Sequence, residues 1–256
     1  MVVHYGGAFV IGIIVGFLGG LFGKGGSAIA TPMLSLIGLP GFVAVAAPLP
    51  ATVPGTFIAS LEYWKSDLLD WQIVRWSILV GIPATIIGSS LTEFTGAAPL
   101  LIVTGLMVLA FGLSFLLSPK ERGRSSRDKD STAPPRPSRW RLRLVVVAAG
   151  VGLISGLLAN SGGILLAPSY ARILNQPIKK AFACSLAVSM VLAIPGTIVH
   201  AYLGHINWLV TASLALGSVP FSYFGAKVAL KAQPQKLERW YGLALTALGA
   251  FFLLQF

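Results

Sequence analysis

Two glycine-rich interruptions decide the fold of this chain: GGLFGKGGSAIATP at residues 19–32 and GLLANSGGILLAP at residues 156–168. Each one breaks a long apolar run and ends at a proline. Glycine runs open a helical backbone because glycine lacks the side chain that restricts φ and ψ. Inside a membrane, such open backbone occurs only where it is buried in protein or lines a water-filled cavity. We therefore interpret residues 19–27 and 156–163 as the tips of two hairpins, the first tip and the second tip.

The rest of the chain has the composition of a membrane protein. Of its 256 residues, 55% are hydrophobic and only 11% are charged, against about 25% charged residues in soluble domains. Several apolar runs, such as residues 100–117, approach the ~20 residues that a spanning helix needs. These runs are continuous and lack the alternating pattern of a barrel. The sequence predicts an all-α polytopic membrane protein.

An internal repeat organises these segments. A shift of about 136 residues superposes Gly16 and Gly20 on Gly152 and Gly156. Consistent offsets along the chain indicate two transmembrane repeats, 1–117 and 141–256, joined by a basic linker, 118–140. Each repeat is predicted to contain a re-entrant or helical hairpin and three spanning helices, giving about 8–10 membrane segments. The expected helices are 5–22, 27–38, 43–61, 72–91 and 98–117, then 142–158, 163–174, 178–203, 207–230 and 237–255.

Positive charge predicts the topology. The net charge is +11, and nine of the nineteen lysines and arginines lie between Lys120 and Arg143. Basic loops beside membrane spans stay in the cytoplasm, so the linker is expected on the cytoplasmic side of the bacterial inner membrane. The basic charge is thereby explained, and nucleic acid is not an expected partner. If each hairpin returns to its starting side, further basic residues also lie inside: Lys65, Arg75, Arg172, Lys179, Lys180, Lys227, Lys231, Lys236 and Arg239.

The alternative threading counts the first two segments of each repeat as one span and leaves seven of these basic residues outside. The hairpin threading is therefore favoured. It makes the two repeats inverted and places both termini outside. Inverted repeats are typical of secondary transporters.

The tips supply the candidate binding site. Each tip precedes a new helix, whose free N–H groups and positive dipole end attract anions. The predicted substrate-binding residues are Gly23, Lys24, Gly25, Gly26 and Ser27, then Asn160, Ser161, Gly162 and Gly163, with Thr52 and Ser189 on the third helices. These residues also have alternative roles that involve no ligand. Lys24 could extend its ammonium group to the membrane interface, and the glycines could serve close helix packing. The serine and threonine hydroxyls could donate to the backbone of their own helix.

Other chemistries lack their residues. Gly23-Lys24 resembles part of a P-loop, but Leu18 stands where its first glycine belongs and Gly25 where Ser or Thr belongs. The only histidines are His4, His200 and His205, with no acidic partner at ligand spacing. We therefore expect no catalytic site, no metal and no cofactor.

Paired glycine-rich tips, each followed by a proline and joined by a polar loop, resemble the sulfite exporter TauE/SafE family over nearly the whole chain. The family's tip pattern is close to G-x-G-G-G, then an apolar stretch and a proline. Residues 23–27 with Pro32 fit this pattern except that Ser27 replaces the last glycine, and residues 159–163 with Pro168 fit it more loosely. The resemblance implies export or uptake of sulfur-containing anions and sulfonates.

The predicted function is a secondary transporter or facilitator of sulfite, thiosulfate or organosulfonates, working by alternating access around the two tips. Its expected partners are a small anionic substrate and the lipid bilayer, and the sequence leaves homo-oligomerisation open. Two alternatives remain: a transporter of another small anion, such as a carboxylate, and a non-catalytic membrane subunit of a larger complex.

Overall fold

The computed structural model describes residues 2–23, 26–91, 97–117, 139–158 and 160–254. The described residues form eleven α-helices and no strand, which confirms the all-α prediction. The helices are α1 (Val2–Phe22), α2 (Ser27–Leu36), α3 (Gly41–Ala46), α4 (Pro48–Lys65), α5 (Trp71–Leu91), α6 (Ala97–Leu117), α7 (Trp140–Leu157), α8 (Gly163–Arg172), α9 (Ile178–Tyr202), α10 (Trp208–Lys231) and α11 (Pro234–Leu254).

Six helical segments of the described chain are long and apolar enough to cross a membrane, so the protein is a multi-pass membrane protein. A seventh apolar helix, Ile102–Leu117, is shorter over its described residues. The six candidate spans are Tyr5–Phe22, Val43–Lys65, Trp71–Leu91, Trp140–Leu157, Ile178–Tyr202 and Trp208–Lys231.

The same order of helices occurs twice along the chain, and in each half the second helix is short. Helices α2 and α8 have ten residues each, about 15 Å at 1.5 Å per residue, which is half the thickness of a hydrocarbon core. Helix α2 runs back along α1, because Gly26 lies against Val15 and Ile37 lies against Gly7. The segment α1–α2 is therefore the helical hairpin that the first tip predicts.

The third segment of the first half differs from its prediction. A single helix was expected over 43–61, but α3 ends at Ala46 and α4 begins at Pro48. Pro48 and Pro50 lack the N–H groups that would continue the hydrogen-bond ladder from α3. Helix α9, which lacks prolines at its start, runs unbroken over the same length.

Equivalent caps begin α5 and α10, the second-to-last helices of the two halves. The Asp70 carboxylate accepts hydrogen bonds from the N–H groups of Gln72 and Ile73, at 3.1 and 3.3 Å. The Asn207 side chain accepts from Leu209 and Val210, at 3.1 and 3.2 Å. Each cap satisfies orphan donors of a helix N-terminus, so these two residues fix where α5 and α10 begin.

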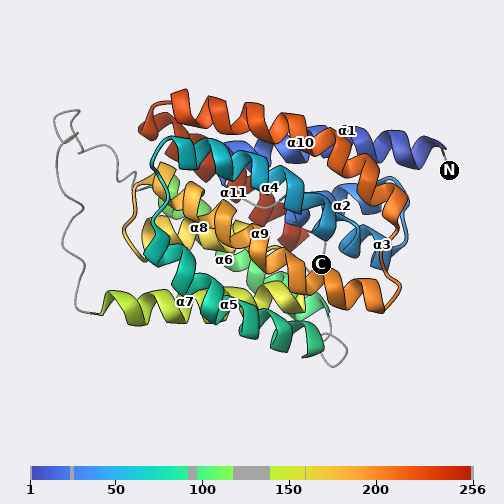
Figure 1. Cartoon of the computed structure of the whole chain (residues 1–256), viewed down its shortest axis with the longest axis horizontal. Helices are drawn as coiled ribbons and strands as arrows, with labels where there is room; N and C mark the ends of the chain where they lie inside the picture. The colour runs from blue at the N-terminus through green and yellow to red at the C-terminus, as the bar shows by residue number, and fades with distance from the viewer. Residues whose placement is uncertain (1, 24–25, 92–96, 118–138, 159, 255–256) are drawn as a thin grey trace.

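The first helix of each half packs against the second-to-last helix of the other half. Figure 1 shows α1 beside α10 along one side of the molecule and α7 beside α5 along the opposite side, with α4 and α9 between. Glycines set both interfaces. Gly16 and Gly20 lie against the backbone of Ser218 and Ser222, while Gly152 and Gly156 lie against the backbone of Gly81 and Thr85. Both helix pairs are therefore parallel, in matching register.

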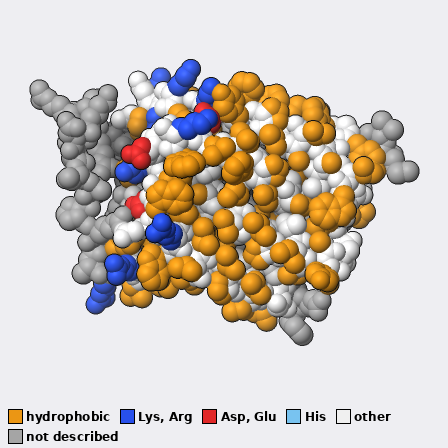
Figure 2. Space-filling model, in the orientation of Figure 1, with side chains coloured by type: hydrophobic (Ala, Val, Ile, Leu, Met, Phe, Trp, Pro, Cys, Tyr) orange, Lys and Arg blue, Asp and Glu red, His pale blue; other side chains and the backbone are white. Residues whose placement is uncertain are grey.

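Basic side chains gather at one end of the molecule. Figure 2 shows Lys and Arg concentrated at the end where α7 begins, while hydrophobic side chains cover most of the remaining face. At this end the Lys179 ammonium donates to the Leu230 carbonyl at 2.6 Å. The Arg172 guanidinium donates to the Ser114 carbonyl at 3.0 Å. Helix α1 begins at the opposite end (Figure 1).

The close α5–α7 interface predicts a sharp difference between two glycine substitutions. In Gly88→Ala the new methyl would overlap the Leu153 carbonyl oxygen of α7, so we expect a loss of about 1–3 kcal/mol in the free energy of unfolding. Gly150→Ala is the control, because nothing lies within 4 Å of its methyl position. Thermal unfolding of both variants in detergent tests this, and equal unfolding temperatures would contradict the interface.

Candidate functional site

The two tips meet in the interior of the protein. The hydroxyl oxygens of Ser27 and Ser161 lie 3.1 Å apart, and the Ser161 backbone N–H donates to the Ser27 hydroxyl at 3.1 Å. Both side chains are fully buried, with exposed fractions of 0% and 1%. Two predicted site residues that are 134 residues apart in sequence thus form one junction.

The described part of the first tip is closely packed. Gly23 has a φ of +64°, a left-handed conformation that favours glycine. A side chain there would also collide with Phe182 of α9. Gly26 precedes the first residue of α2 and lies against Val15. Two further predicted site residues, Lys24 and Gly25, lie outside the described residues.

The second tip is held by its own polar groups. Gly162 has a φ of +75°, and its N–H donates to the Asn160 side-chain oxygen at 2.6 Å. The Ser185 hydroxyl of α9 donates to the Gly163 carbonyl at 3.3 Å. Asn160 uses its amide oxygen within the tip, so its NH₂ group is the part left to donate to a ligand.

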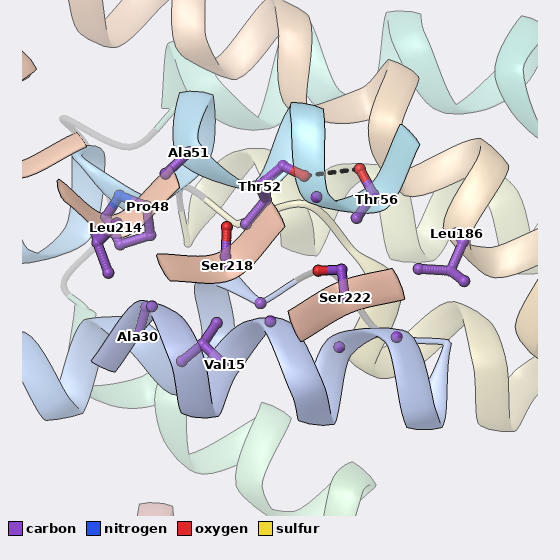
Figure 3. A pocket seen from close by; sticks show the side chains of 16 residues that line it. Val15, Ala30, Pro48, Ala51, Thr52, Thr56, Leu186, Leu214, Ser218 and Ser222 are labelled. Atoms are coloured by element: carbon purple, nitrogen blue, oxygen red, sulfur yellow. Dashed lines mark hydrogen bonds between the residues drawn. The ribbon is translucent and has the colours of Figure 1, made fainter. Parts of the chain in front are cut away.

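A cavity adjoins the first tip. The gaps between its lining atoms, together with the open solvent at its mouth, add up to about 370 Å³, so the space for a bound molecule is much smaller than this figure. Figure 3 shows α1 and α2 on one side of this space, with Thr52 and Thr56 of α4 opposite, and with Ser218 and Ser222 of α10 between them. The predicted site residues Gly26 and Thr52 line it, whereas Ser189 does not.

Sequence reasoning missed Ser218 and Ser222. The signal that points to them is their spacing of four residues, which puts both hydroxyls on one face of α10. That face packs on the four-residue glycine spacing of α1, at Gly12, Gly16 and Gly20. Because these glycines lack side chains, the backbones of α1 and α10 approach closely, and the serine side chains border the cavity beside this contact.

The threonines of the cavity are bonded to their own helix. The Thr52 hydroxyl donates to the Leu49 carbonyl at 2.7 Å, and the Thr56 hydroxyl donates to the Thr52 carbonyl at 2.8 Å. The alternative reading of these hydroxyls as helix-bonded is therefore confirmed for Thr52. Their oxygen lone pairs remain available to the cavity, and a ligand that accepts hydrogen bonds requires the hydroxyls to rotate.

Metal ligands do not assemble in the described part of the chain. It contains no group of three or more His, Cys, Asp or Glu residues that could hold a metal ion. His200 and His205 face each other with their Nδ1 atoms 3.2 Å apart, near the end of α9. A pair of imidazoles falls short of the four ligands of a structural zinc site.

Comparison with known proteins places this architecture among transporters. The family model described as sulfite exporter TauE/SafE matches residues 8–252. The probable membrane transporter protein YunE of Bacillus subtilis is 25% identical, over 86% of this chain and 85% of the relative. A probable membrane transporter protein of Methanocaldococcus jannaschii is 26% identical, over 96% of this chain and 94% of the relative. No solved structure matches.

The junction between the tips predicts a specific cross-link. With Cys184→Ala removing the native thiol, Ser27→Cys together with Ser161→Cys should form a disulfide on mild oxidation, because the replaced hydroxyl oxygens lie 3.1 Å apart. After proteolytic cleavage of the linker, the two halves should migrate as one band until reduced. Ser27→Cys with Ser213→Cys is the control, and equal cross-linking of both pairs would contradict the junction.

Proposed function

Because this chain belongs to the sulfite exporter TauE/SafE family of membrane transporters, we propose that it moves small sulfur-containing anions across the bacterial inner membrane. It acts as a secondary transporter or facilitator, and its substrates are sulfite, thiosulfate or organosulfonates. The observation that carries this proposal is the buried contact of Ser27 with Ser161 beside a cavity.

The chemistry of the tips suits an oxyanion. Helices α2 and α8 both begin at the tips, and the first N–H groups of a helix have no acceptor within it. These donors and the positive ends of the two helix dipoles favour an anion. The hydroxyls of Ser27 and Ser161 and the Asn160 amide add donors that the three oxygens of a sulfite or sulfonate group accept.

Many alternating-access transporters consist of two inverted halves, and the helix directions support this arrangement here. Helix α4 is antiparallel to its equivalent α9, because Leu49 at the start of α4 lies against Gly196 late in α9, and the N–H of Asp70, in the loop after α4, donates to the Cys184 sulfur early in α9. The same holds for α6 and α11: Leu109 lies against Gly249, and Phe115 against Gly242. Equivalent helices that point in opposite directions are related by an axis in the membrane plane, as in inverted-repeat transporters.

The two halves differ in how open they are. Gly55 of α4 faces Ser218 and Ser222 and leaves the cavity free. At the equivalent place in the second half, the Leu192 side chain of α9 lies against Gly81. This difference, a cavity beside the first tip and a leucine side chain at the equivalent place beside the second, supports the proposal, because the two halves of an alternating-access transporter differ in each end state.

The charge distribution orients the protein. The basic end of the molecule (Figure 2) faces the cytoplasm under the positive-inside rule. In this orientation the linker is cytoplasmic, and both termini are outside.

Filling the cavity tests the transport path. In Gly55→Leu, the added side chain enters the space beside Ser222 and Ser218, and we expect sulfite flux into proteoliposomes to fall by at least ~10-fold. The substitution should also lower the free energy of unfolding by about 1–3 kcal/mol, because it overpacks the site. Gly6→Leu is the matched control, because nothing lies within 4 Å of its methyl position. Both proteins must elute as monodisperse peaks, and undiminished flux through Gly55→Leu would remove the cavity from the path.

The flux assay also separates the substrate classes. Sulfite, thiosulfate, an organosulfonate and a carboxylate of similar size are compared in the same vesicles. Transport of the sulfur anions in preference to the carboxylate supports the proposal, and preference for the carboxylate contradicts it. Flux that survives Lys24→Ala combined with Gly26→Leu would exclude the first tip from binding.

Labelling tests the orientation independently of transport. In the Cys184→Ala background, His4→Cys should react with a membrane-impermeant maleimide applied outside intact cells. Ser126→Cys in the linker should react only after the cells are opened. Labelling of both cysteines from the same side would refute the inverted threading.

A further inference from the structure

Four aromatic side chains from four different helices meet beside the first tip. Phe22 ends α1, while the other three lie on α6, α9 and α11, and all four are buried. The Tyr241 ring is at the centre of this group. Its centroid lies 4.8 Å from that of Phe182, 5.2 Å from that of Phe115 and 5.5 Å from that of Phe22. These four residues are called the aromatic cluster below.

The aromatic cluster lies between the first tip and the basic end of the molecule. On the side of the tip, Phe22 directly precedes Gly23, and a side chain at Gly23 would collide with Phe182. On the other side, the Arg172 guanidinium lies 4.0 Å from the centre of the Phe115 ring. Arg172 belongs to the basic end, which faces the cytoplasm under the positive-inside rule. The aromatic cluster therefore separates the first tip from the cytoplasmic side.

The cavity lies on the other side of the first tip. Its lining runs along α4 from Pro48, the first residue of that helix, to Thr56, and along α10 from Leu214 to Ser222. Helix α10 is parallel to α1, which begins at the end opposite the basic residues. Helix α4 also begins there, because it is antiparallel to α9. The cavity thus extends from the first tip toward the outer end, away from the aromatic cluster.

Smaller side chains occupy two equivalent positions in the first half. Helices α6 and α11 make reciprocal contacts, and their register makes Thr104 the equivalent of Tyr241. The contacts pair Gly112 with Thr246 and Gly249 with Leu109. In the same way, the α9 residue Phe182 is as far from Pro177 as the α3 residue Val45 is from Pro40, and each proline directly precedes its helix. The ring contact that Tyr241 makes with Phe182 therefore has no equivalent between Thr104 and Val45.

The hydroxyl of Tyr241 distinguishes it from a residue that only packs. This hydroxyl is buried, and it has no hydrogen-bond partner among the residues that the structure describes. Tyr63 and Tyr170 are equally buried, but they donate to the Gly20 carbonyl at 3.1 Å and to the Ser77 hydroxyl at 2.7 Å. An unpaired buried hydroxyl is destabilising because it has lost its bonds to water. The hydroxyl of Tyr241 thus favours any arrangement in which water reaches it.

We propose that the aromatic cluster is the cytoplasmic gate of the transport path, and that the Tyr241 hydroxyl sets how readily this gate opens. The inference rests on the proposed function, because a gate requires a transported anion. In the arrangement described here the rings close the cytoplasmic side of the first tip, while the cavity lies on its outer side. Separation of the rings admits water to the Tyr241 hydroxyl, and the regained hydrogen bonds lower the free energy of the open state relative to the closed one.

Arg172 connects this gate to the second tip. Its guanidinium donates to the Ser114 carbonyl of α6 at 3.0 Å and interacts electrostatically with Glu238 of α11. It therefore bridges the two helices that carry Phe115 and Tyr241. Arg172 ends α8, which begins at the second tip. A displacement of the second tip on anion binding is thus transmitted through α8 to the gate.

Removing one oxygen atom tests the role of the hydroxyl. In Tyr241→Phe, the unfolding temperature of the purified full chain in detergent should rise by at least about 2 °C, because an unpaired hydroxyl is lost. Sulfite flux into proteoliposomes should fall by at least ~5-fold, because the closed gate becomes more stable relative to the open one. The combination of higher stability with lower flux is specific to a gating role.

Tyr170→Phe is the matched control, because it removes a buried hydroxyl that donates to Ser77. This variant should unfold at the wild-type temperature or below and keep the wild-type flux. A Tyr241→Phe protein that unfolds below the wild-type temperature would show that the hydroxyl has a partner, and would overturn its role. Higher stability with undiminished flux would overturn the role of Tyr241 in the gate as well.

Access to the first tip tests the gate without transport. Ser27→Cys in the Cys184→Ala background is treated in inside-out membrane vesicles with MTSET, a cationic, membrane-impermeant thiol reagent. Adding Tyr241→Ala removes the central ring and should raise the rate of modification at least ~10-fold, because the open state becomes more populated. Adding Tyr241→Phe should lower the rate below that of the parent, and this conservative variant tests the gate even if Tyr241→Ala does not fold.

Phe224→Ala is the control for access, because it removes an exposed ring of α10 and should leave the rate of modification unchanged. Equal rates in the Tyr241 variants and this control would overturn the gate. If sulfite flux is measured alongside such equal rates, anion transport stands and only the gate is lost. The predicted changes in modification rate without flux of any anion would overturn the proposed substrate and leave the gate standing.

Discussion

The structure depends on one constraint: backbone polar groups cannot be left unpaired in lipid. Both glycine-rich tips open the helical ladder, so both must be enclosed by protein. They meet each other at the Ser27–Ser161 contact, where a hydroxyl of one half accepts an N–H of the other. The polar junction thus lies where the two halves meet, and two short helices, α2 and α8, begin there. Without this enclosure neither tip would be stable inside the membrane.

Glycine packing then sets the shape around the junction. Along α1 and α7, glycines at four-residue spacing bring the backbones of α10 and α5 into direct contact. In the first half, every side chain that lines the cavity has four or fewer heavy atoms. In the second half, the Leu192 side chain lies against Gly81, at the place that corresponds to Gly55. A common arrangement of helices thereby leaves a cavity beside the first tip and a leucine side chain at the equivalent place in the second half.

The hydroxyl groups divide in the same way. In the cavity, Thr52 and Thr56 donate to their own helix and present lone pairs. Around the second tip, Ser155 and Ser189 have no bond to their own backbone. The hydroxyls beside the two tips therefore differ in their hydrogen bonding, although the helices that carry them follow the same order.

The sequence by itself determined the helical class, most helix bounds within a few residues, and both tips, because glycine runs, proline breaks and apolar length act locally. It also indicated the family through those tips. It did not determine the break at Pro48, the lining role of Ser218 and Ser222, or which hydroxyls lack partners. Only the tertiary structure decided these, since they depend on which helix of the other half lies opposite each residue. The pairing of α1 with α10 and of α7 with α5 joins segments far apart in the chain, and local patterns carry no information about such distant neighbours.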